Sequence, residues 1–157
     1  MKGKLVWLLL ACLMVTILVL TSCAGNSAKE IAEKFVEAEN EAWNTGNVDA
    51  LDEVEDPNIV IHMMGASDMV GREAHKQFIA GARRSFSNPQ HEFLDITGTG
   101  DIAAFRYTER FTFAGKEVYY QGAMFLHIKN GKIVEIYMVW DTMSLNQGLG
   151  LVPASSQ

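Results

Sequence analysis

The spacing of apolar residues changes from helical to alternating near His91, and this change constrains the fold more than any other feature of the sequence. Before it, apolar residues recur three or four positions apart. After it, they alternate with polar residues, as in strands that bury one face. Four strands are therefore predicted, at residues 91–98, 101–113, 117–128 and 132–141. Asn130-Gly131 separates the last two, and Asn-Gly between alternating runs indicates a β-hairpin.

The first half of the chain predicts three helices and one strand. Ser27 with Glu30 three positions later fits a capping box, and Gly46 is a typical helix stop. The elements expected after this helix are a short helix at 48–54, a strand at 58–64, a loop at 65–71 and a helix at 72–86. This order predicts an α+β domain, in which a curved mixed or antiparallel sheet wraps like a cone around three N-terminal helices and encloses a pocket.

The N-terminus predicts export and lipid attachment. Lys2 and Lys4 precede an uncharged run at 5–20, which is typical of a signal peptide. An uncleaved membrane anchor is the alternative, because the run is near the lower length limit for a span. The following Leu20-Thr-Ser-Cys23 resembles a bacterial lipobox. That resemblance implies cleavage before Cys23, its modification by a diacylglyceryl group and an N-acyl chain such as palmitate, and anchoring to the exported side of a membrane, the outer membrane in a Gram-negative cell.

These features divide the chain into a signal peptide at 1–22, a lipidated cysteine and tether at 23–26, one domain at 27–150 and a loose tail at 151–157. Residues 1–22 carry two lysines and no acid, so the rest has 11 basic and 19 acidic side chains and a net charge of about −8. Such an acidic domain argues against nucleic acid as a partner.

Neither a disulfide nor a metal is expected. Cys12 lies in the signal peptide and Cys23 would be lipidated, so the domain retains no thiol. The four histidines show no paired spacing of the kind that binds metal ions.

The order of elements and the C-terminal segment resemble the SnoaL-like group, relatives of polyketide and ester cyclases within the nuclear transport factor 2-like superfamily. The residues that carry the resemblance are Val70-Gly71, Gly131-Lys-Ile133, Trp140-Asp141, Leu145, Gln147 and Gly150-Leu-Val-Pro153. It covers about residues 26–153, and implies a dimeric cone with a mostly apolar cavity and no cofactor. The superfamily includes enzymes, binding proteins and transport factors, so fold does not decide function.

The resemblance also implies a catalytic pair, with Asp141 as general acid/base and His127 on the neighbouring strand. A three-residue turn at 129–131 would place both on one face, with Asp141 opposite Tyr119. A two-residue turn would move His127 to the other face, because a one-residue shift of register reverses every side chain. The alternatives are that Asp141 caps a helical turn at 142–146 and that His127 is exposed.

Further pocket residues follow from the strand pattern. The odd positions of 101–113 are the more apolar and should face inward, which places Tyr107 and Glu109 there. A buried carboxylate is costly unless it is paired or protonated, so a bulge that turns Glu109 outward is the favoured alternative. Tyr119 and Trp140 are expected at the pocket as well.

The sequence also predicts where the other three histidines lie. His62 is expected in the core or at the pocket rim, because it lies between Ile61 and Met63. His75 and His91 are expected to face solvent.

Three functions stay open: binding of a small hydrophobic molecule, cofactor-free cyclase, isomerase or lyase chemistry through Asp141, or a dimeric interaction domain. The long middle hairpin has Glu109-Arg-Phe-Thr112 where many family members have a Gly-Thr-His turn. This difference favours ligand binding over catalysis. A lipid anchor about four residues from the domain also favours it, because an apolar ligand partitions into the bilayer.

Overall fold

The computed structural model describes residues 27–153. The predicted signal peptide, the lipidated Cys23 with its tether and the last four residues of the predicted tail lie outside this range. Along the chain the elements are α2 (Ala28–Thr45), η1 (Val48–Glu53), β1 (Glu55–Met63), β2 (Met69–Val70), α3 (Arg72–Ser85), β3 (Ser87–Thr99), β4 (Ile102–Phe113), β5 (Lys116–Lys129), β6 (Lys132–Trp140) and α4 (Thr142–Leu149).

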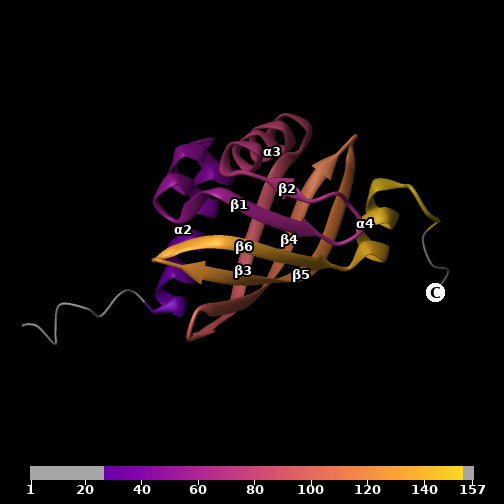
Figure 1. Ribbon diagram of the computed structural model, residues 1–157. Helices are drawn as coiled ribbons and strands as arrows, with labels where there is room; N and C mark the ends of the chain where they lie inside the picture. The colour runs from indigo at the N-terminus through magenta and orange to yellow at the C-terminus, as the bar shows by residue number, and fades with distance from the viewer. Residues whose placement is uncertain (1–26, 154–157) are drawn as a thin grey trace, which may run out of the picture.

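The strands form one six-stranded mixed sheet in the order β2-β1-β6-β5-β4-β3. β1 runs parallel to β6, and every other neighbouring pair is antiparallel. In Figure 1, α2 and α3 lie beside the twisted sheet, and α4 follows the end of β6 at the far side from α2. The α+β architecture predicted from the sequence is therefore confirmed.

Two prolines lie inside strands that were expected to begin after them. β1 starts at Glu55, and its pairing with β6 is interrupted between Glu55 and Val60, around Pro57. β3 starts at Ser87, and its pairing with β4 is interrupted between Ser87 and Gln90, around Pro89. Proline lacks the N–H of the ladder, so it is tolerated where pairing is irregular.

The first helix is determined by its own sequence. The predicted capping box is present: Glu30 N–H donates to Ser27 Oγ at 3.2 Å, and Ser27 N–H donates to Glu30 Oε2 at 2.7 Å. Gly46 ends the helix in the left-handed conformation, with φ of 86°. The apolar face of α2 packs on the inner face of the sheet to form the core, whose fully buried side chains include Phe35, Ile61, Leu126 and Ile136.

The helices and the sheet do not fill the space between them. α2 packs against β3 and β4, whereas α3 packs against β1, β2 and η1. α4 contacts β5 and was expected only as a short helical turn. A cavity remains between α2, α3, α4 and the inner face of the sheet. No helix of residues 27–153 is long and apolar enough to cross a membrane.

Candidate functional site

The cavity has a volume of about 330 Å³. That volume is within the range of small-molecule sites in proteins. Its wall is almost entirely apolar and rich in aromatic rings and methionine. The aromatic members are Phe35, Trp43, Phe78, Phe86, Phe93, Tyr107, Phe111, Tyr120 and Trp140, and the methionines are Met63, Met69, Met124 and Met138. Among the described residues of the wall, those with carboxyl or imidazole groups form two histidine–glutamate pairs.

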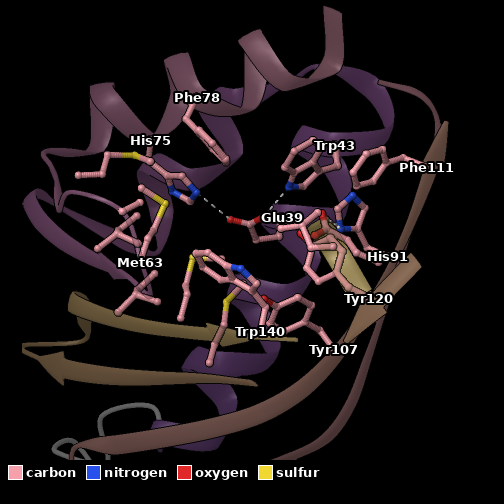
Figure 2. A pocket seen from close by; sticks show the side chains of 18 of the residues that line it. Glu39, Trp43, Met63, His75, Phe78, His91, Tyr107, Phe111, Tyr120 and Trp140 are labelled. Atoms are coloured by element: carbon pink, nitrogen blue, oxygen red, sulfur yellow. Dashed lines mark hydrogen bonds and ion pairs between the residues drawn. The ribbon is translucent and has the colours of Figure 1, made fainter. Parts of the chain in front are cut away.

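The first pair is His75 on α3 with Glu39 on α2. His75 Nε2 lies 3.4 Å from Glu39 Oε1, and His75 Nδ1 lies 2.8 Å from Glu55 Oε1 on β1. The imidazole therefore lies between two carboxyl groups (Figure 2 shows the Glu39 side). The side chains of Glu39, Glu55 and His75 are 5%, 0% and 8% exposed. Such deep burial makes their charges depend on one another.

Burial raises the pKa of Glu39, the nearby His75 lowers it and Glu55 raises it, with a net increase. Burial by itself would lower the pKa of His75, but the hydrogen bond to Glu55 and the charges of Glu39 and Glu55 raise it above the usual value. The favoured state is an imidazolium shared between the two carboxyl groups. His75 thus provides the positive charge that this part of the cavity wall requires.

These three residues are close enough to hold a metal ion, because their ligand atoms all lie within 4.8 Å of one another. The arrangement of the ring argues against it. The two carboxyl groups lie on opposite nitrogens of His75, so the imidazole occupies the space between them. A metal ligand normally uses one ring nitrogen for the metal and the other for an orienting partner.

The second pair is His91 on β3 with Glu109 on β4, which are directly paired across the two strands. His91 Nδ1 lies 3.2 Å from Glu109 Oε1, and the two side chains are 8% and 11% exposed. Burial and the charge of Glu39 raise the pKa of Glu109 to about 8. Burial lowers the pKa of His91 to about 4. At neutral pH both groups are uncharged, so their close contact is not an ion pair.

Trp43 connects the two pairs. Its Nε1–H donates to Glu39 Oε2 at 2.8 Å, and its ring lies against the His91 ring with centroids 4.6 Å apart. In Figure 2 these side chains, with Tyr107 and Tyr120, surround one space. The cavity therefore offers a protonated carboxylic acid, Glu109, and the coupled Glu39–His75 pair to the same bound molecule.

Three of the predicted pocket residues line the cavity: Tyr107, Glu109 and Trp140. Glu109 faces inward because the pairing of β4 with β5 continues without interruption from Ile102 to Phe113. The favoured prediction of a bulge that turns Glu109 outward is wrong. Burial and the charge of Glu109 raise the pKa of Tyr107, whose hydroxyl lies 3.5 Å from the carbonyl oxygen of Val139.

Asp141 does not line the cavity. It is exposed and forms the N-cap of α4, where Ser144 N–H donates to Asp141 Oδ1 at 3.0 Å and Ser144 Oγ donates to Oδ2 at 2.6 Å. These hydrogen bonds lower its pKa, whereas a proton shuttle in an apolar pocket requires a raised one. The helix-cap alternative describes Asp141, and the geometry gives no support to a catalytic role.

His127 also lies outside the cavity. Asn130 and Gly131 form a two-residue turn with φ values of 53° and 76°, and Lys129 pairs with Lys132. A bulge then brings His127 opposite Glu135, on the outer face of the sheet. The side chain of His127 is 45% exposed, and its Nδ1 lies 3.2 Å from Glu135 Oε2.

Tyr119 and His62 are not pocket residues either. Tyr119 is 45% exposed on the outer face beneath the guanidinium of Arg110, while its neighbour Tyr120 takes the inward position opposite Glu109. His62 lies between two carboxylates, with Nδ1 3.0 Å from Asp68 and Nε2 3.0 Å from Glu135. Both hydrogen bonds, the one to Glu135 first, raise the pKa of His62.

Glu39, His75 and His91 are cavity residues that sequence reasoning missed, and the prediction that both histidines face solvent is wrong. A signal for Glu39 was present, because it follows Ile31 and Phe35 at intervals of four on the apolar face of α2. The sequence contains a weaker signal that His75 is buried. Its burial depends on how α3 packs against β1, which no local pattern contains.

The comparisons with known proteins agree with this fold. Residues 36–136 match the SnoaL-like domain family. This match spans more than half of the chain, so the protein belongs to the SnoaL-like family. No functionally curated protein is significantly similar to it in sequence.

Solved structures show the same fold. A protein assigned as a polyketide cyclase from Bacillus cereus is 26% identical, with a TM-score of 0.65 over 74% of this chain and 78% of that one. TsrD from Streptomyces laurentii is 18% identical, with a TM-score of 0.69 over 78% and 96% of the two chains. A ketosteroid isomerase-like protein from Catenulispora acidiphila, in complex with trimethylamine, is 18% identical, with a TM-score of 0.65 over 78% and 96%.

Proposed function

We propose that the protein is a lipid-anchored binding protein for a small, largely apolar molecule. The observation that carries this proposal is the cavity of about 330 Å³ with its wall of aromatic and methionine side chains. Removing an apolar ligand from water into such a cavity is favourable by about 25 cal/mol per Å² of buried surface. Flexible methionines let the wall adapt to the shape of the ligand.

Membrane attachment through Cys23 is the second part of the proposal and rests on the sequence of the export signal. A lipidated Cys23 would hold the domain close to the bilayer, where an apolar ligand concentrates. Cys23→Ala should move the protein from the membrane fraction to the soluble fraction. A distribution that is the same with and without Cys23 would contradict the lipoprotein assignment.

The ligand-binding part is tested with the neutral fluorescent dye Nile red and the isolated domain. Met138→Trp would fill part of the cavity, because Met138 lines it. Met143→Trp is the matched control, since Met143 is 61% exposed on α4. We expect the Met138 variant to lose most dye binding and the Met143 variant to keep it, with the Tm of each checked first. Equal dye binding by both variants would contradict a ligand site in the cavity.

A second candidate is cofactor-free acid–base chemistry of the isomerase or cyclase type. It is favoured by one observation: Glu109, with a pKa of about 8, and the Glu39–His75 pair belong to the same cavity. A protonated carboxylic acid can donate to a substrate carbonyl while a second group removes a proton. Hydrogen–deuterium exchange at the carbon next to the carbonyl of a bound ketone, lost in Glu109→Gln, would support this candidate.

A homodimer is the proposed assembly. The outer face of the sheet exposes apolar side chains at Ile102, Tyr119, Phe125, Tyr137 and Val139, each 38–45% accessible. Exposed apolar patches of this kind commonly mark an interface. Light scattering should give twice the monomer mass for the domain and the monomer mass for Phe125→Glu. A wild-type domain that remains monomeric at high concentration would contradict the proposal.

A further inference from the structure

We propose that the ligand of the cavity carries one positive charge, as a protonated or quaternary amine attached to an apolar body. This inference rests on the proposed ligand-binding function and adds the chemical class of the ligand. The positive group would lie between Glu39 and Glu109, with the apolar body against the aromatic wall.

The cavity has more carboxyl groups than cations. Glu39 and Glu109 line it directly, and Glu55 lies behind His75. Neither lysine nor arginine is among the described residues that form the wall. The nearby Lys76 points away and is held by Asp49 and Asp52 at 2.9 and 2.6 Å.

Among the described residues of the wall, His75 is the one cation, and it is already paired with carboxyl groups. His75 lies between Glu55 and Glu39 and contacts both. Glu109 is left with the uncharged ring of His91 as its partner. A charged carboxylate in this position requires a counter-ion that the described residues do not supply, because burying an unpaired charge is costly. A cationic ligand would supply it.

The aromatic wall suits the same group. Trp43, Phe111 and Tyr120 lie around Glu39 and His91 in the cavity wall (Figure 2), and Tyr120 is paired with Glu109 across β4 and β5. The negative face of an aromatic ring attracts a cation, and aromatic cages are a recurrent site for quaternary ammonium groups.

His91 also has a buried nitrogen without a hydrogen-bond partner among the described residues. The His91 side chain is 92% buried, and its Nε2 has no hydrogen-bond partner within residues 27–153. When Glu109 loses its proton, His91 can donate to it through Nδ1, and Nε2 then becomes an acceptor. A protonated amine can donate to that nitrogen, so binding would satisfy an otherwise unpaired atom.

The other ligand classes fit less well. An anion would meet two carboxyl groups with no arginine or lysine to balance it. A neutral hydrocarbon fits the apolar wall but gives an ionised Glu109 no counter-ion and forms no hydrogen bond with His91 Nε2. The charge of the wall therefore selects for a cation over a neutral molecule of the same shape.

Binding of a cation should release a proton. The titratable groups that face Glu109 are Glu39 on α2, His91 on β3, Tyr120 on β5 and Tyr107 on its own strand, and none of them is a cation at neutral pH. A bound cation stabilises the charged form of Glu109 and lowers its pKa. Affinity for the cation should therefore rise between pH 6 and pH 8.

The test uses two probes of the same shape, phenyltrimethylammonium and tert-butylbenzene, each displacing Nile red from the domain. At pH 8 we expect the cation to bind at least about tenfold more tightly than the hydrocarbon. In Glu109→Gln this ratio should fall towards one. The matched control is Glu117→Gln, since Glu117 is 66% exposed on β5 and should leave the ratio unchanged. Calorimetry of the wild type in two buffers of different ionisation enthalpy measures the proton release directly and does not depend on a variant folding.

The possible outcomes separate the two proposals. If tert-butylbenzene binds as tightly as the cation, or the cation binds without releasing a proton, the charge inference is wrong and the binding function stands. If neither probe displaces the dye and the dye itself does not bind in the cavity, both are wrong. A ratio that changes equally in the Glu109 and Glu117 variants would show a general charge effect and also overturn the inference.

Discussion

Tyr107 occupies the space that a side chain at position 122 would need. Tyr107 and Gly122 are paired across β4 and β5, and a Cβ atom built on Gly122 would lie 2.5 Å from the tyrosine hydroxyl oxygen. The carbonyl oxygen of Val139 on β6 would also meet that Cβ. Because Gly122 has no side chain, Tyr107 can pack closely over the backbone there and also line the cavity.

Gly122→Ala should lower the free energy of unfolding by about 2–3 kcal/mol, because the added methyl group overlaps both atoms. Adding Tyr107→Phe should recover little of this loss, since the Val139 carbonyl oxygen and the ring Cζ atom, also 2.5 Å from that Cβ, stay in place. Urea denaturation measures both variants. The control is Gly81→Ala in α3, where a Cβ would meet only Arg84, 3.7 Å away. That change should be neutral or stabilising by up to ~1 kcal/mol, and equal losses at the two glycines would contradict the packing argument.

Glu109→Gln should make the domain more stable at high pH. The pKa of this carboxyl is 4.5 in the reference state and about 8 in the fold. Between these values the folded state holds a proton that the unfolded state has lost, so the free energy of unfolding falls as pH rises. Glutamine does not titrate and can donate to His91. The variant should match the wild type near pH 4 and exceed it by a difference on the order of 5 kcal/mol above pH 8.

Chemical denaturation of both proteins at several pH values measures this difference. His91 is uncharged in both proteins over most of this range, because its pKa of about 4 lies at the lower end of it. A wild type that gains stability relative to the variant as pH rises would show that Glu109 is ionised and paired in the fold.

The inward position of Glu109 shows what the sequence could and could not establish. The alternation of residues 101–113 correctly predicted which face of β4 is buried. A bulge was then preferred because a carboxylate on an apolar face is costly. That reasoning omitted a protonated acid supported by a histidine from the next strand. The partner could be identified only once the pairing of β3 with β4 placed His91 opposite Glu109.

The hairpin at Asn130-Gly131 shows a second limit. The turn type was one of the two alternatives that the sequence left open, and it decided the face of His127. The bulge after Ile133 has no local signal in the sequence, yet it determines that Asp141 lies opposite Gln121 instead of Tyr119. Because side chains alternate with period two, small errors in register moved Tyr119 and His127 out of the predicted pocket.

Replacing a buried and an exposed histidine, each in contact with a carboxyl group, should have very different effects. His75→Ala removes the partner of Glu55, which is fully buried and whose Oε2 already has no hydrogen bond. We expect it to lower the free energy of unfolding by about 3–5 kcal/mol. His127→Ala is the control, because its contact with Glu135 is exposed, and it should change stability by less than ~0.5 kcal/mol. Thermal unfolding of both variants checks this, and a small effect at His75 would contradict the buried arrangement.

Asp141→Ala tests whether Asp141 acts as a helix cap or as a catalytic carboxylate. Loss of the cap should fray α4 and lower the Tm by about a few degrees, while Asp141→Asn should keep most of the wild-type Tm. The hydrogen bonds from Ser144 lower the pKa of Asp141 below 3.8, so its contribution is present above that pH and is lost as pH falls through the folded-state pKa. The wild type and the alanine variant should therefore converge in Tm under strongly acidic conditions.

Asp141→Ala also tests whether Asp141 takes part in ligand binding or catalysis. Because Asp141 lies outside the cavity, Asp141→Ala should bind Nile red as the wild type does and should keep any carbon-acid exchange that Glu109→Gln abolishes. A loss of exchange in Asp141→Ala with the Tm unchanged would restore Asp141 as a catalytic residue. It would also mean that α4 moves to bring this carboxylate into the cavity when a ligand binds.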